Sequence, residues 1–166
     1  MNHYKEIQSP VGLLKLIASE KGLAAVLWEN EKPDRVKIDQ GVEDIFNSIL
    51  IETEKQLNEY FRKERTVFDL PLDFTGTDFQ KKVWDALLTI PFGETRSYGD
   101  MAKYLGDIKA VRAVGAANGR NPISIIAPCH RVIGISGKLT GFAGGLQNKA
   151  FLLRLENSRK MPGLWD

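Results

Sequence analysis

The sequence predicts a small α/β domain over residues 1–75, followed by a mostly helical domain over residues 76–166 that carries a helix-turn-helix. Three observations lead to this fold class: strand-like segments near the start, helix-like periodicity from about residue 42 onward, and opposite charge in the two halves. Residues 1–75 hold 10 Lys and Arg against 14 Asp and Glu, whereas residues 76–166 hold 13 against 7. The basic second half suits a polyanionic partner, although solvated surface charge is the commoner cause of such a split.

The composition is typical of a soluble globular protein, with 43% hydrophobic and 27% charged residues. No apolar run approaches the roughly 20 residues that span a bilayer, and the first residues lack the apolar core of a secretory signal. A single cysteine excludes an internal disulfide, which suits a reducing cytoplasm, where we expect this protein to act. One cysteine and two histidines do not make a usual zinc ligand set, so we expect no metal.

The first domain begins with strands and continues with a helix. Turn-forming residues separate three segments that read as short strands: 3–8, 13–19 and 24–28. From about 42 to 63, apolar residues recur mostly at three- and four-residue spacing, which predicts an amphipathic helix. Residues 66–70 have the pattern of a returning strand, and residues 72–76 are the expected linker. No chemically active groups converge in this domain, which leaves it without a predicted chemistry.

The second domain begins with a clear helix signal. Thr77 and Gln80 form a capping box. The apolar residues that follow share one helix face: Phe79, Val83, Trp84, Leu87 and Leu88. Ser97 is the expected N-cap of a short helix that ends near Leu105, and residues 109–118 form the next helix after a turn. Two short helices about a tight turn predict a helix-turn-helix, although helical hairpins are also common in cores that touch no DNA.

The helix at 109–118 has little side-chain bulk. Its small residues are Ala110, Ala113, Gly115, Ala116 and Ala117. Such residues allow either close approach of the backbone to a ligand or tight packing between helices, and the sequence leaves both open. Arg112 is the long cation among them. Asn121 follows in a turn, where Asn side chains often bond their own backbone, so its role is structural, functional or both.

Cys129 is the single cysteine of the chain. A lone cysteine in an intracellular protein is most often a small buried hydrophobe. Here His130 and Arg131 follow at once, and both favour the thiolate form that acts as a nucleophile. Apolar residues on either side predict a packed, partly buried strand-to-turn segment. The thiol is therefore a candidate nucleophile.

Several motifs occur in a characteristic order and spacing. They are Ser97-Tyr98, Lys109-Ala110-Val111-Arg112-Ala113-Val114-Gly115, Asn121-Pro122, Pro128-Cys129-His130-Arg131-Val132 and Gly144-Gly145-Leu146. The set closely resembles the O6-alkylguanine-DNA alkyltransferases. The resemblance covers residues 77–157, whereas residues 1–75 match only in size and general pattern. Pro-Cys-His-Arg-Val is the most specific of these motifs.

The resemblance implies a mechanism in which the damaged guanine is flipped out of the duplex and its alkyl group moves to Cys129. His130 would deprotonate the thiol through a bridging water, with Glu156 behind the imidazole, which is the general logic of an activated thiol. Without the resemblance, Glu156 is simply a polar residue on an amphipathic C-terminal helix. Because a thioether is a poor leaving group, each molecule would act once.

Further roles follow from the same resemblance. Tyr98 would help rotate the nucleotide and donate a hydrogen bond to the departing guanine, and Arg112 would fill the gap in the base stack. Asn121 would link the recognition helix to the active-site segment. The resemblance also implies a guanine pocket formed by the Val132 carbonyl, the Ala143 amide, Phe142 and Gly144. It implies contact with DNA by Ser97, Ala110 and Gly115.

The resemblance also implies partners and a form of the fold. The helix-turn-helix would be winged and enter the minor groove of double-stranded DNA that contains O6-alkylguanine, and the protein would act as a monomer without a cofactor or a membrane partner. Two other classes remain as alternatives. A non-enzymatic lesion binder or helix-turn-helix regulator has no need of Cys129, and a cysteine hydrolase has no use for the helix-turn-helix.

Overall fold

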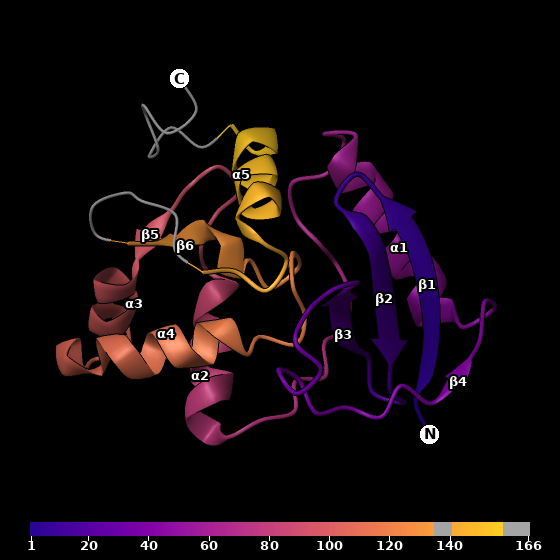
Figure 1. The fold of residues 1–166 in the computed structure, drawn as a ribbon, viewed down its shortest axis with the longest axis horizontal. Helices are drawn as coiled ribbons and strands as arrows, with labels where there is room; N and C mark the ends of the chain where they lie inside the picture. Colours follow the sequence, from indigo (N-terminus) through magenta and orange to yellow (C-terminus); the bar gives the residue numbers. More distant parts are fainter. Residues whose placement is uncertain (135–140, 158–166) are drawn as a thin grey trace. The chain divides into compact units, whose positions relative to one another are not determined.

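The computed structural model describes residues 1–134 and 141–157, and the chain divides into two compact units (Figure 1). The first unit comprises Met1–Thr75 together with Pro122–Ser124. The second comprises Gly76–Asn121 together with the residues from Ile125 onward. The division after Thr75 falls inside the stretch expected to be the linker. The first unit is rich in sheet and the second is mainly helical, as the sequence predicts.

A four-stranded sheet in the order β3-β2-β1-β4 forms the first unit. Its strands are β1 (His3–Ser9), β2 (Gly12–Ala18), β3 (Leu23–Trp28) and β4 (Val42–Glu43). The first three pair antiparallel in sequence order, and β4 pairs parallel with β1. The hairpin between β1 and β2 turns at Gly12, whose φ of +94° is rarely adopted by a residue with a side chain. The three strands predicted from the sequence are confirmed.

Helix α1 (Ser48–Phe61) packs on this sheet and begins later than the sequence pattern indicates. Asn47 caps the helix, because its side chain accepts hydrogen bonds from two backbone N–H groups of the first turn. Ile45 and Phe46, expected on the helix, precede it and are 51% and 83% exposed. The expected start near residue 42 is therefore wrong. The buried apolar face of α1 consists of Leu50, Leu57 and Tyr60.

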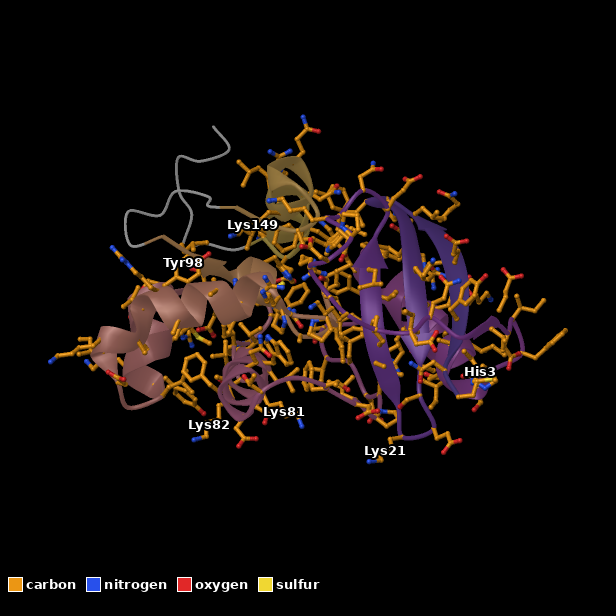
Figure 2. The ribbon with its side chains drawn as sticks, turned by 60° about the horizontal axis from the view of Figure 1, so that its bottom comes forward. His3, Lys21, Lys81, Lys82, Tyr98 and Lys149 are labelled. Atoms are coloured by element: carbon orange, nitrogen blue, oxygen red, sulfur yellow. The ribbon has the colours of Figure 1, made fainter. Side chains whose placement is uncertain are left out.

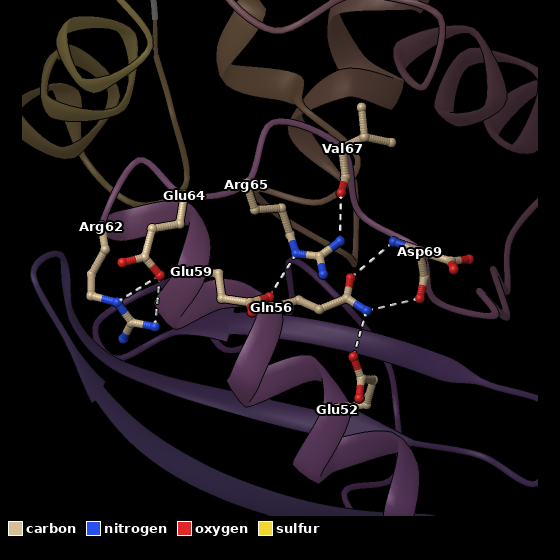
Figure 3. Close-up of polar contacts among 8 residues, drawn as sticks. All are labelled: Glu52, Gln56, Glu59, Arg62, Glu64, Arg65, Val67 and Asp69. Carbon is tan, nitrogen blue, oxygen red and sulfur yellow. Dashed lines mark hydrogen bonds and ion pairs between the residues drawn. The ribbon is translucent and has the colours of Figure 1, made fainter.

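A side chain, not a strand, fixes the segment at residues 66–70 (Figure 3). Gln56 of α1 accepts a hydrogen bond from the Asp69 N–H at 2.9 Å and donates one to the Asp69 carbonyl at 2.9 Å. Arg65 donates to the Glu59 carboxylate and to the Val67 carbonyl. The strand expected at 66–70 is therefore wrong, since an amide side chain supplies the two backbone bonds that a neighbouring strand would have made.

The second unit contains the remaining helices. Its elements are α2 (Asp78–Leu87), β5 (Arg96–Ser97), α3 (Tyr98–Tyr104), η1 (Ile108–Ala110), α4 (Val111–Gly119), η2 (Cys129–Arg131), β6 (Val132–Ile133) and α5 (Leu146–Leu155). Capping boxes at Thr77 and Ser97 confirm both predicted N-caps. The helix expected from residue 109 opens with the 3-10 turn η1, so that α4 itself begins at Val111. None of the helices in the described residues is long and apolar enough to cross a membrane.

Two contacts organise the second unit around its site. The buried Trp84 of α2 donates its indole N–H to the Ala117 carbonyl of α4 at 2.8 Å. Leu88, expected on the same apolar face as Trp84, is instead 44% exposed just after the helix ends. Strands β5 and β6 pair in parallel, Arg96 with Val132 and Ser97 with Ile133. The start of α3 therefore lies beside the residues that follow Cys129.

Candidate active site

Cys129 lies in a tight turn, within the segment of residues 125–133 that we call the thiol loop. The Cys129 N–H donates to the Ala127 carbonyl at 2.8 Å, and the Arg131 N–H donates to the Pro128 carbonyl at 2.9 Å. These bonds form the 3-10 turn η2, after which the chain extends into β6. The thiol is unbridged and Cys129 is 3% exposed. The expected packing is confirmed, but the turn precedes the strand and Cys129 is buried, not partly buried as expected.

His130, Arg131 and Glu156 form a buried polar cluster. Nε2 of His130 lies 2.7 Å from Oε2 of Glu156, and neither side chain has exposed surface. The Arg131 guanidinium donates to both carboxylate oxygens of Glu156, at 2.8 Å from Nε and 3.0 Å from Nη2. Its Nη1 donates to the Ile90 carbonyl at 2.6 Å. The thiol loop and the C-terminal end of α5 are therefore joined through one carboxylate.

Burial and charge set the protonation of this cluster. Burial alone would raise the pKa of Glu156, but the hydrogen bonds from His130 and Arg131, together with the charge of Arg131, hold that pKa well below its usual range. Burial lowers the pKa of His130 from 6.5, against the opposing pull of Glu156. His130 is therefore neutral at neutral pH and donates Nε2–H to the carboxylate. Its Nδ1 makes no hydrogen bond to any residue in the described ranges and is left to accept a proton.

Lys149 is a buried cation on α5 that links several candidate site residues. Figure 2 marks its position. Its Nζ donates to the Val132 carbonyl at 2.8 Å and lies 5.9 Å from the centre of the Phe142 ring. Burial lowers the pKa of Lys149 to about 8, and attraction to Cys129 opposes that shift. Lys149 is therefore largely charged at neutral pH. A cation within electrostatic reach of a thiol favours the thiolate.

Two asparagine side chains reach the thiol loop from the end of α4. Asn121, which is fully buried, donates from Nδ2 to the Ala127 carbonyl at 2.8 Å. Asn118 donates from Nδ2 to the Cys129 carbonyl at 3.4 Å. The Asn121 side chain therefore fixes the backbone just before the thiol.

The small residues of α4 lie on both a buried and an exposed face of the helix. Val114 and Ala117 are buried, so one face packs within the unit. Arg112, Ala113 and Ala116 are exposed, so the other face has little bulk apart from one long cation. A ligand can therefore approach the backbone of α4 closely on its exposed face.

Tyr98 and Gly115 bring α3 and α4 together. Tyr98 is the first residue of α3, directly after its N-cap Ser97. A Cβ added at Gly115 would lie 3.8 Å from the Tyr98 ring, so the glycine leaves the ring in close contact with the α4 backbone. Ala110 ends η1 and stands at the N-cap position of α4. The residues expected to contact DNA thus lie along the two helices and their caps.

The segment at residues 142–144 is held against the start of α5. The Gly145 N–H donates to the Phe142 carbonyl at 2.9 Å, and Asn148 Nδ2 donates to the Gly144 carbonyl at 2.8 Å. Phe142, Ala143 and Gly144 are each partly buried. Since Lys149 contacts both the Val132 carbonyl and the Phe142 ring, it brings these two pocket candidates close together.

The sequence did not predict the role of Lys149 or the two hydrogen bonds from Arg131 to Glu156. Lysine is rarely buried in proteins, so its side chain was not counted among the site residues. The helical period nevertheless carries a signal, because the buried positions of α5 and its cap follow an i, i+3, i+4, i+7 pattern. These positions are Lys149, Leu152, Leu153 and Glu156. Two charged residues on the inner face of one helix mark it as part of a site.

A buried thiol directly before a neutral histidine that a carboxylate holds is an arrangement that can activate a cysteine. Two family models together cover most of the chain. Residues 78–158 match the DNA binding domain of 6-O-methylguanine DNA methyltransferase, and residues 2–74 match its ribonuclease-like domain. The chain belongs to the 6-O-methylguanine DNA methyltransferase family.

Similar proteins from bacteria and archaea agree with this family. The methylated-DNA–protein-cysteine methyltransferase of Mycobacterium bovis is 52% identical over 163 residues, covering 96% of this chain and 94% of the relative. The protein of the same name from Methanosarcina acetivorans is 50% identical, covering 94% and 99%. The crystal structure of Mycobacterium tuberculosis OGT in complex with DNA superposes on this chain with a TM-score of 0.85 and 50% sequence identity. The match covers 95% of this chain and 94% of that one.

The coupling between Lys149 and Cys129 predicts a change in the pKa of the lysine. In the unmodified protein, the Nζ group should titrate near pH 8 instead of 10.5, because burial penalises its charge. Attraction to Cys129 raises that pKa, so Cys129→Ala should lower it further. The measurement is NMR titration of selectively labelled lysine side chains in both proteins. A Lys149 midpoint that stays the same or rises in Cys129→Ala would contradict the coupling.

Proposed function

We propose that this chain repairs O6-alkylguanine in double-stranded DNA by direct reversal, moving the alkyl group irreversibly to its own Cys129. The single observation that carries this proposal is the arrangement of the thiol loop, in which the sole cysteine precedes a neutral histidine held by Glu156. Membership of the family and the names of relatives that are 50–52% identical support the same activity. A related structure in complex with DNA supports duplex DNA as the partner.

The proposed transfer is a displacement at a saturated carbon. The Cys129 thiol gives its proton to His130 Nδ1 through a bridging water, and Glu156 stabilises the imidazolium that forms. The sulfur lone pair then forms a bond to the alkyl carbon while the bond from that carbon to guanine O6 breaks. The electron pair of the broken bond stays on the guanine. The Tyr98 hydroxyl assists the departure of the guanine by donating a hydrogen bond to it. The guanine anion then takes up one proton and the imidazolium of His130 releases one, so the products are an S-alkylcysteine, unmodified guanine and a neutral His130.

The reaction needs no cofactor and ends with the protein consumed. The substrate itself carries the alkyl group, so no donor molecule is required. The product is a thioether, which is a poor leaving group, so Cys129 is not regenerated and each molecule acts once. Because a reduced thiol is essential, we propose that the protein works in the cytoplasm, as a monomer on DNA.

The guanine pocket is proposed to lie at the Val132 carbonyl. This carbonyl and the Ala143 amide would read the guanine edge, and Phe142 and Gly144 would shape the pocket. The hydrogen bond from Lys149 fixes the direction of the Val132 carbonyl, and a carbonyl oxygen has a second lone pair left for the base. This arrangement would orient the alkylated oxygen toward the thiol loop.

The pair α3 and α4 is proposed to be a winged helix-turn-helix that enters the minor groove. The exposed face of α4 is small except for Arg112, which suits close approach to the duplex with little reading of sequence. Arg112 would occupy the space of the flipped nucleotide, since flipping costs a few kcal/mol of lost stacking and pairing. Ser97, Ala110 and Gly115 would support backbone contact, and Asn121 would link α4 to the thiol loop.

Incubation with duplex DNA that contains O6-methylguanine tests the acceptor. Peptide mass spectrometry should place one methyl group on Cys129, and Cys129→Ala should bind the lesion DNA yet transfer nothing, because it lacks the nucleophile. A non-enzymatic lesion binder would bind the DNA and stay unmodified, and a cysteine hydrolase would not interact with it. Full transfer in Cys129→Ala would end the proposal.

Arg112 should matter only where a base has to be replaced in the stack. Arg112→Ala should therefore lose activity on duplex DNA and keep most of its reaction with free O6-benzylguanine, which is already unstacked. The measurement is the ratio of the two rates in the variant and in the parent protein. Lys109→Ala is the matched control, because Lys109 is another exposed cation close to α4 and its loss should leave the ratio unchanged. An unchanged ratio in Arg112→Ala would contradict the proposed stacking role.

A further inference from the structure

Residues 122–124, from the second half of the sequence, are part of the first unit. These three residues belong to the first unit, although the residues on both sides belong to the second. The Val26 N–H of β3 donates to the Pro122 carbonyl at 2.9 Å, and Val26 and Ile123 form a parallel bridge. Ile123 and Ser124 are fully buried. A short length of chain just before the thiol loop is thus added to the edge of the β3 strand.

The side chain of Trp28 holds residues 122–124 against β3 by a hydrogen bond. The indole N–H of Trp28, at the end of β3, donates to the Ser124 hydroxyl at 3.0 Å, and the hydrogen bond is buried. Trp28 is 6% exposed and Ser124 has no exposed surface. Burial makes this bond costly to break, because both polar groups would be left without water. We call the hydrogen bond between Trp28 and Ser124 the strap.

The residue directly after the strap has a strained backbone. Ile125 has a φ of 74°, in the left-handed region that a β-branched residue rarely occupies, and its side chain is fully buried. Such a conformation persists only where the surroundings enforce it. Ser124 is held by the strap on one side, and Ala127 is held by Asn121 at 2.8 Å on the other. The strained residue is therefore fixed from both ends.

We propose that Trp28 and Ser124 are positioning residues for alkyl transfer, which gives the first unit a part in the chemistry. This inference rests on the proposed function. The strap fixes where the thiol loop starts, Ile125 turns the chain, and the hydrogen bond from Asn121 fixes Ala127 two residues before Cys129. The path of the backbone from Ser124 to Cys129 then has little freedom. The proposed effect of the strap is to limit where the Cys129 sulfur can lie when it attacks.

Single-turnover kinetics with O6-methylguanine duplex separate positioning from general stability. The variants are Ser124→Ala, Trp28→Phe and the double variant, which remove the hydrogen bond while keeping most of the buried volume. Ser19→Ala is the matched control, because its hydroxyl donates to Asp73 at 2.6 Å in the same unit without touching residues 122–129. Thermal unfolding of each protein is recorded alongside the transfer rate at saturating DNA and the Kd for the lesion duplex.

Each strap variant should lower the saturating transfer rate by about 10-fold, since misplacement of a reacting atom by a fraction of an ångström is costly. The Kd for DNA should stay within error of the parent value, and the double variant should be no slower than the slower single variant. Ser19→Ala should keep the parent rate even where its melting temperature falls. Parent rates in the strap variants, or rates that fall in step with melting temperature in all four variants, would overturn the inference. An inactive parent protein would contradict the proposed function itself.

Discussion

The candidate site depends on one buried carboxylate. The Glu156 side chain has no exposed surface, and an ionised carboxylate at such a position is stable only when it is paired and fully hydrogen-bonded. Arg131 supplies the charge, through two hydrogen bonds, and His130 supplies a third. Removal of one partner from such a pair typically costs about 3–5 kcal/mol, because the other charge is left buried alone. One of these three bonds, from Nε2 of His130, also fixes the imidazole ring.

Helix α5 supplies two opposite charges to two different parts of the site. Lys149 and Glu156 are separated by two helical turns, which is roughly 10 Å along the axis at 1.5 Å per residue. Lys149 contacts the Val132 carbonyl and is attracted to Cys129, whereas Glu156 contacts His130 and Arg131. The cation thus favours negative charge on the sulfur, and the anion favours positive charge on the imidazole. Both charges that would develop in the proposed proton transfer from Cys129 to His130 are thus matched in advance.

Local signals in the sequence predicted much of the fold and part of the site. The capping boxes at Thr77 and Ser97 need only residues three positions apart, so they could be recognised directly. The start of α1 and the segment at 66–70 were predicted wrongly, because Asn47 and Gln56 decide them through hydrogen bonds that periodicity does not show. The site features that were missed depend on distant contacts. The extension of β3 by residues 122–124 joins parts of the chain that are far apart in sequence, and local pattern gives no sign of it.

The protonation state of His130 is the decisive test of the proposed mechanism. Proton transfer from Cys129 requires a neutral imidazole whose Nε2 carries the proton and whose Nδ1 can accept one from the thiol. Nitrogen NMR of the imidazole should show this single tautomer at neutral pH, with protonation only well below the ordinary pKa of 6.5. An imidazolium at neutral pH, or a proton on Nδ1, would contradict the claim that Glu156 holds His130 as the base for Cys129.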